Sequence, residues 1–185
     1  MAVLKALRVF VAATLVLTSA ESSSAPTETQ VKAVFLFNFA RFVEWPTTTF
    51  ADANPQFTLC IFGADPLALD LDAVVRGESV SGRPLSVHRV QEAADLPRCQ
   101  ILFIPRSAER ELDSLVASLD RRATLTVSDI EDASQRGVMI RLMAVAGKMR
   151  LRVNVDAVRA AHLTVSSNLL RAAEIVGDAG PGSGG

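Results

Sequence analysis

The sequence has little excess charge, few cysteines and few histidines, and each shortage argues against a class of function. Its 185 residues carry 19 Lys and Arg against 20 Asp and Glu, which gives a net charge of −1. No basic run exceeds two residues, so we do not expect binding to the phosphate backbone of nucleic acids. Two cysteines are too few for a dense disulfide framework or for a zinc site built from cysteines alone, and two histidines leave little for a metal cluster.

A long apolar run is also missing, although a short one stands near the N-terminus. Two basic residues precede residues 9–17, which are apolar except for one threonine, and small residues then lead to Ala20. The run is well short of the ~20 residues that span a bilayer, so a cleaved signal peptide is favoured over a retained anchor. We predict cleavage between Ala20 and Glu21, with Ala25 as the alternative site. The mature protein is then expected to be periplasmic, without membrane insertion.

Export changes the interpretation of the two cysteines. In an oxidising compartment Cys60 and Cys99 are expected to form a disulfide bond with each other. The alternative is a pair of buried thiols that act as small apolar side chains. The two cysteines are not in a Cys-x-x-Cys pair, so a thioredoxin-type catalytic dithiol is not indicated.

The mature chain opens with a leader and a helix. Residues 21–26 are expected to form the leader. Thr27 and Gln30 have the spacing of a capping box, and the helix is expected to end before Pro46. A periodic stripe predicts the buried face of this helix, consisting of Val31, Val34, Phe35, Asn38, Phe39 and Phe42.

Strands then alternate with helices. Short apolar or β-compatible segments predict strands over residues 57–62, 84–90, 101–104 and 123–127. One helix is expected to begin after an Asp65 cap with Pro66 in its first turn, and another to cover residues 109–119. This order predicts an α/β fold of the flavodoxin-like three-layer type, with a largely parallel sheet.

The C-terminal third has a different pattern. Residues 138–145 and 148–153 flank the Ala-Gly pair 146–147, which predicts an antiparallel hairpin and therefore a mixed sheet. The single α/β domain is expected to span residues 27–176. Residues 177–185, rich in glycine, are expected to form a disordered tail.

Two further helices are expected after the hairpin. Asn154 or Asp156 is the predicted cap of a short helix, and Ser166 or Ser167 caps a second helix that is predicted to run to Val176.

The residues that carry chemistry in related folds are absent from the expected places. Pro105 and Arg106 follow the third predicted strand, where a phospho-receiver domain needs its acceptor aspartate. Asp65 is interpreted as a helix cap, and neither His88 nor His162 has a second ligand at metal spacing on its element. We therefore predict no catalytic residue, no cofactor and no metal site.

Three side chains are candidates for a partner surface. Trp45 either packs against the core, which is the stronger interpretation, or anchors a partner. Arg150 and Arg152 alternate with apolar residues, so one strand face is basic and open to a partner or to water. The alternative function is a small-molecule module, with its ligand beyond the carboxyl ends of the parallel strands near Gly63 and Pro105.

The mature sequence resembles the YfiR family of periplasmic proteins. The opening block Val-Lys-Ala-Val-Phe-Leu-Phe-Asn-Phe-Ala-Arg-Phe-Val-Glu-Trp-Pro is specific, although Phe37 replaces a frequent tyrosine. The later blocks follow in the family's order, at residues 59–66, 82–85, 99–104, 125–129, 137–140, 149–154 and 166–173.

This resemblance implies a regulator and not an enzyme. The best-understood members bind the periplasmic sensor region of an inner-membrane diguanylate cyclase and hold it inactive, which controls cyclic di-GMP and biofilm formation. It also implies a Cys60–Cys99 disulfide and a homodimer. The better-known relatives carry a second cysteine pair that this chain lacks, so redox switching that depends on that pair is not carried over.

Overall fold

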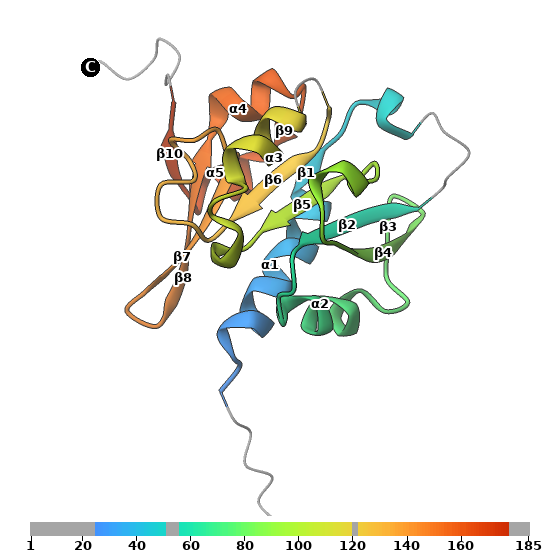
Figure 1. Cartoon of the computed structure of the whole chain (residues 1–185), viewed down its shortest axis with the longest axis horizontal. Helices are drawn as coiled ribbons and strands as arrows, with labels where there is room; N and C mark the ends of the chain where they lie inside the picture. Colours follow the sequence, from blue (N-terminus) through green and yellow to red (C-terminus); the bar gives the residue numbers. More distant parts are fainter. Residues whose placement is uncertain (1–24, 51–55, 120–121, 178–185) are drawn as a thin grey trace, which may run out of the picture.

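The central sheet of the protein has eight strands in the order β10-β8-β7-β6-β5-β2-β4-β3 (Figure 1). The computed structural model describes residues 25–50, 56–119 and 122–177. Five neighbouring strands run parallel: β2 (Phe57–Phe62), β4 (Arg83–Val90), β5 (Ile101–Ile104), β6 (Leu125–Ser128) and β7 (Ile140–Val145). Counted along the chain, their order is 2-1-3-4-5, which is the flavodoxin-like order. The predicted α/β fold is thereby confirmed.

Antiparallel and short strands complete the sheets. β8 (Lys148–Asn154) pairs antiparallel with β7, which confirms the hairpin and the mixed sheet. β3 (Ser79–Val80) pairs antiparallel with β4. A separate two-stranded sheet joins β1 (Val43–Glu44) to β9 (Thr164–Val165).

The last strand corrects the sequence prediction. The predicted helix to Val176 is wrong, because α5 (Ser167–Arg171) is short and β10 (Glu174–Val176) follows it. β10 pairs in parallel with the edge of β8. The unpaired N–H and C=O groups at the edge of β8 form hydrogen bonds with residues 174–176, which therefore adopt a strand. Periodicity within residues 167–176 cannot reveal this pairing, because β8 is distant in the sequence.

The other helices lie close to their predicted positions. They are α1 (Glu28–Phe42), α2 (Leu67–Val75), α3 (Leu112–Ser118) and α4 (Val155–Ala160), with 3-10 turns η1 (Thr47–Phe50), η2 (Ala93–Asp95) and η3 (Arg106–Ala108). α3 begins three residues later than predicted, because turns occupy the segment before it. Of the described helices, none has the length and apolarity needed to cross a membrane.

Side-chain caps position the helix starts. Thr27 and Gln30 form the predicted capping box of α1. Asn154 accepts a hydrogen bond from the amide of Ala157 at the start of α4, and Ser166 accepts one from Leu169 at the start of α5. Each cap satisfies an amide that the first helical turn leaves without a backbone partner.

The buried face of α1 differs from the predicted stripe. Val34 is 46% exposed and Phe42 39% exposed, so these two residues were wrongly placed on the buried face, whereas Phe39 of the predicted stripe is fully buried. The buried residues of α1 are Lys32, Ala33, Leu36, Phe39 and Ala40. Apolar residues stand on several sides of this helix, so its periodicity does not select one face.

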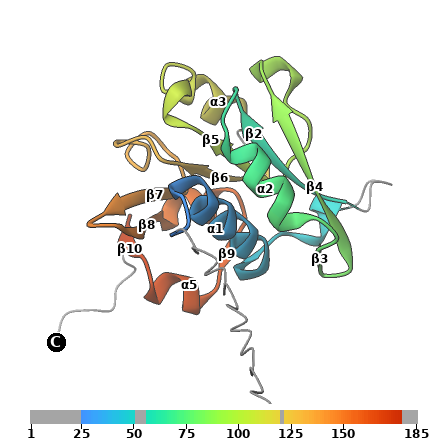
Figure 2. The same cartoon turned by 90° about the horizontal axis from the view of Figure 1, so that it is seen from below.

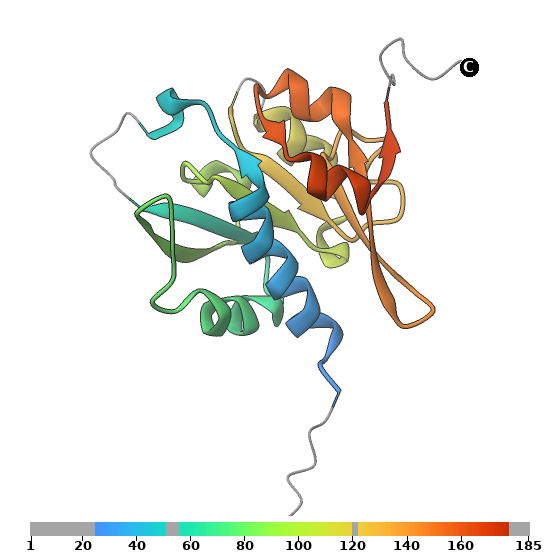
Figure 3. The ribbon, with the colours of Figure 1, turned by 180° about the vertical axis from the view of Figure 1, so that it is seen from behind.

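The sheet separates two apolar cores. Leu59 and Ile61 of β2 point into the core formed with α1, α2, α4 and α5. Cys60 and Phe62 of the same strand point into the second core, which includes Leu112 of α3. Figures 2 and 3 show α1 and α2 on one side of the strands, and α3 lies on the other. This two-sided burial explains the continuous apolar runs of the parallel strands.

Candidate functional site

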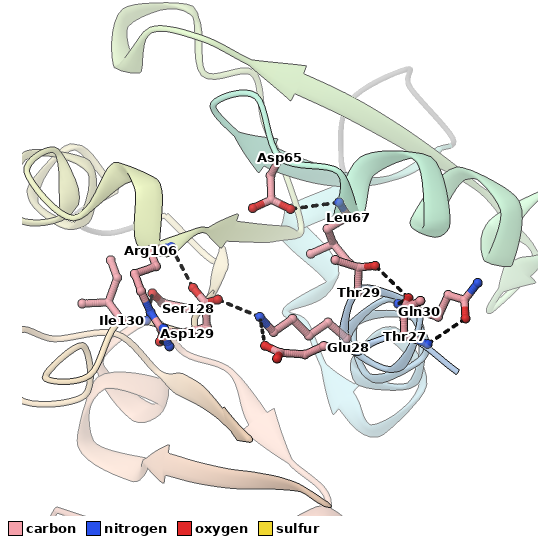
Figure 4. Close-up of polar contacts among 11 residues, drawn as sticks. Thr27, Glu28, Thr29, Gln30, Asp65, Leu67, Arg106, Ser128, Asp129 and Ile130 are labelled. Atoms are coloured by element: carbon pink, nitrogen blue, oxygen red, sulfur yellow. Dashed lines mark hydrogen bonds and ion pairs between the residues drawn. The ribbon is translucent and has the colours of Figure 1, made fainter. Parts of the chain in front are cut away.

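A group of charged residues joins the start of α1 to the carboxyl ends of two parallel strands (Figure 4). Asp129 directly follows β6, and Arg106 follows Pro105 after β5. Asp129 Oδ1 accepts a hydrogen bond from the backbone N–H of Arg106 at 2.7 Å, and Oδ2 accepts one from Lys32 Nζ at 2.7 Å. Lys32 Nζ also lies 2.6 Å from Glu28 Oε1. The group therefore ties three segments together.

Lys32 and Asp129 are shielded from water, with side chains 10% and 12% exposed. Burial by itself would lower the pKa of the Lys32 amine, but its hydrogen bonds to Asp129 and Glu28 outweigh burial and raise the pKa above its ordinary 10.5. The amine therefore stays protonated, and both Asp129 oxygens already accept hydrogen bonds. This arrangement supports a structural tie and not proton transfer.

Sequence reasoning did not single out Lys32 or Asp129 as interacting residues. Two signals were present. A lysine at a buried helix position needs a counter-charge, and an aspartate directly after a buried strand lies at the carboxyl edge of the sheet. The two residues are 97 positions apart in the sequence, so no local pattern indicates that they form a pair.

Asp65 has the structural role that its sequence context indicates. Its Oδ1 accepts a hydrogen bond from the amide of Leu67 at 2.8 Å, while Pro66 occupies the cap position one residue later than predicted. Asp65 therefore helps to start α2, as a side chain that satisfies a free helical amide does.

A disulfide bond joins Cys60 of β2 to Cys99, which precedes β5. Both cysteines are buried, and their Cα atoms are 5.9 Å apart. The bond closes a sequence separation of 39 residues that contains α2 and β4. The predicted pairing is confirmed, and the bond fastens the parallel part of the sheet on the side of the second core.

Trp45 is half-buried at the amino ends of the parallel strands. Its Nε1 donates a hydrogen bond to the carbonyl oxygen of Gln100 at 3.2 Å, and its ring meets Phe57 edge-on at 4.9 Å between centroids. These contacts give it a packing role. A role in partner binding remains a prediction.

A cavity of about 580 Å³ opens at the amino ends of β5 and β6. Its lining includes the basic residues Arg98, Arg122 and His162, together with Cys99 and Thr124. The predicted ligand crevice near Gly63 and Pro105 belongs to the opposite, carboxyl edge of the sheet, so this cavity is not at the predicted place.

The two histidines belong to different parts of the fold. His88 lies on β4, whereas His162 follows α4 and lines the cavity. Within the described ranges, no group of three or more His, Cys, Asp or Glu side chains is placed to hold a metal ion.

Arg150 and Arg152 lie on β8, on the same face of the β7–β8 hairpin. Arg150 is exposed. Arg152 is more buried, with a side chain 27% exposed, and its Nη2 donates to both carboxylate oxygens of Glu174 on β10, at 2.9 and 3.0 Å. The predicted cleavage site at Ala20 and Glu21 lies outside the described residues.

Comparison with known proteins identifies the relatives of this chain. The family model for YfiR/HmsC-like proteins matches residues 29–174, which extend from α1 into β10. A comparison with curated proteins finds no match. The family is regulatory and not catalytic, and it supports a periplasmic role. The chain belongs to the YfiR/HmsC-like family.

Proposed function

We propose that the protein is a periplasmic repressor that binds the sensor region of an inner-membrane diguanylate cyclase. Binding holds the cyclase inactive, so cyclic di-GMP synthesis in the cytoplasm and biofilm formation respond to the state of the cell envelope. The observation that carries this proposal is the family match across nearly all of the described fold. The disulfide agrees with an oxidising compartment.

The proposal includes export and processing. Residues 1–20 act as the signal peptide, cleavage follows Ala20, and residues 27–176 form the regulatory domain. Mass spectrometry of the periplasmic fraction is expected to find a chain that begins at Glu21. A chain that still carries residues 1–20, recovered with the inner membrane, would contradict cleavage.

Deletion of the gene tests the regulatory role directly. Cyclic di-GMP and biofilm are expected to rise on deletion and to return to the parental level when the full chain is supplied. A chain that lacks residues 2–20 serves as a matched control, because it cannot be exported and should not restore repression. Unchanged cyclic di-GMP after deletion would refute the proposal.

The cavity favours a second candidate function, a periplasmic small-molecule-binding module without a cyclase partner. Its volume of about 580 Å³ lies in the range of ligand sites. The basic lining of Arg98, Arg122 and His162 suits an organic anion. A thermal-shift screen of carboxylate and phosphate metabolites is expected to raise the melting temperature of the wild type more than that of an Arg122→Gln variant. Equal shifts in both proteins would exclude this cavity as the site.

A further inference from the structure

One face of the β7–β8 hairpin collects four cationic side chains. Side chains alternate between the two faces of a strand, and directly opposed residues of an antiparallel pair share a face. The cross-strand pairs on this face are Arg141 with Arg152, Met143 with Arg150, and Val145 with Lys148. The opposite face contributes Leu142 and Leu151 to the core. We call Arg141, Lys148, Arg150 and Arg152 the basic hairpin face.

The basic hairpin face lacks carboxylates of its own. Arg141 stands directly opposite Arg152, and like charges in that relation destabilise a sheet. Glu174 pairs with Arg152. The Nε atoms of Arg141 and Arg152 are buried and meet no hydrogen-bond partner in residues 25–50, 56–119 and 122–177. A partner does not reach these two buried atoms directly. The positive charge of the face is instead presented to a partner by Lys148 and Arg150, which are exposed.

The face is also accessible. Figures 1 and 3 show the turn end of the β7–β8 hairpin reaching beyond the neighbouring strands. Lys148 and Arg150 are exposed, and Val145 near the turn is 51% exposed. A partner can therefore approach this end without displacing another element of the fold.

We infer that the basic hairpin face docks a carboxylate-rich segment of a partner protein. Charge complementarity carries this inference, and three of the four cations are arginines, whose planar guanidinium groups suit carboxylates. The contact with Glu174 shows how a carboxylate binds to this face, because Arg152 Nη2 donates to both carboxylate oxygens of Glu174. The inference rests on the proposed regulatory function and names the surface that contacts the partner.

A binding assay with a defined peptide tests the surface. The probe is a fluorescent peptide that alternates glutamate with threonine, and its matched control has glutamine in place of each glutamate. The test variant is Arg141→Glu with Arg150→Glu. The control variant is Arg76→Glu with Arg110→Glu, which changes the net charge equally at two exposed arginines outside the hairpin. Thermal unfolding of each variant checks that it is folded.

The glutamate peptide is expected to bind the wild type and the control variant, and to bind the hairpin variant about tenfold or more weakly. The glutamine peptide is expected not to bind. Equal weakening by both variants would show a response to net charge only and would overturn the inference. Binding to phosphatidylglycerol vesicles without binding to the peptide would overturn it in favour of a lipid surface. If the hairpin variant fails to fold, Arg150→Gln against Arg110→Gln gives the same comparison.

Complementation in cells separates this inference from the proposed function. In the deletion strain, the control variant is expected to restore repression of cyclic di-GMP and the hairpin variant to fail. Equal restoration by both variants would overturn the hairpin inference while leaving the repressor function standing. If deletion itself changes nothing, the repressor function fails, and the peptide assay alone decides whether the face binds carboxylates.

Discussion

The parallel part of the sheet and the β7–β8 hairpin differ in how their charged side chains are paired. At the carboxyl ends of β5 and β6, Asp129 satisfies both Lys32 and the amide of Arg106. On the hairpin, Arg141 faces Arg152 across the strands, and Glu174 pairs with Arg152. A charged side chain that is buried between a helix and the sheet destabilises the fold unless another group of the protein pairs with it. Lys148 and Arg150 of the hairpin need no such pairing, because they are exposed to water, and they stay available to a partner.

Removal of the disulfide should have the largest effect and should act on the parallel part. We expect Cys60→Ala with Cys99→Ala to lower the free energy of unfolding by about 4 kcal/mol, because the unfolded chain regains the freedom of the closed loop. Urea unfolding measures the loss, and the wild type in reductant is the control. If the free energy of unfolding falls by no more than the experimental error, the disulfide does not stabilise the parallel part of the sheet.

Substitution of Asp129 should break the internal tie. Asp129→Ala leaves the Lys32 amine with Glu28 alone and removes the acceptor for the Arg106 amide, so we expect a loss of about 3 kcal/mol in urea unfolding. The matched control is Lys32→Met with Asp129→Asn, which removes both charges and keeps an acceptor for Arg106. The free energy of unfolding of that double variant should stay within about 1 kcal/mol of the wild-type value. If it is as unstable as Asp129→Ala, the ion pair is not the cause.

The internal tie also predicts a dependence on alkaline pH. The pKa of Lys32 is raised in the folded protein above its ordinary 10.5. The stabilisation is therefore fully present below the unfolded-state pKa and is lost as pH rises through the folded-state pKa. Urea unfolding of wild type and Lys32→Met should show a constant difference from neutral pH until this range, followed by convergence. A difference that stays constant through the alkaline range would assign the effect to another group.

The smallest effect is expected on the hairpin, and its sign is reversed. Arg141→Thr removes a cation opposite Arg152 and should raise the free energy of unfolding by about 0.5 kcal/mol. Glu174→Gln is the complementary control, because it leaves the two arginines facing each other without a carboxylate and should lower stability. A marked destabilisation by Arg141→Thr would show that its side chain has a structural contact and would remove the contrast between the two regions.

Local sequence signals located most of the elements. The apolar runs at residues 57–62 and 101–104 predicted β2 and β5, and the capping residues Thr27 and Gln30 placed the start of α1. These signals depend on residues that are close in the sequence, so they can be interpreted without knowledge of the fold. The family pattern similarly indicated the disulfide, which the structure contains.

Predictions failed where a distant partner decided the outcome. Val34 and Phe42 were placed on the buried face of α1, yet neighbouring residues of the helix face the sheet. Residues 174–176 were predicted as helix, but they complete the sheet beside β8. In the candidate site, Lys32 and Asp129 were missed for the same reason, since neither residue identifies the other in sequence.

The sequence alone determined the parallel order of strands and helices, the hairpin and the basic alternation of Arg150 and Arg152, because each depends on a short period or a local turn. Only the tertiary structure decided that Arg141 faces Arg152, that Lys32 pairs with Asp129, and which side of α1 is buried. Those outcomes depend on strand register and helix packing, which bring distant segments into contact and which local periodicity does not specify.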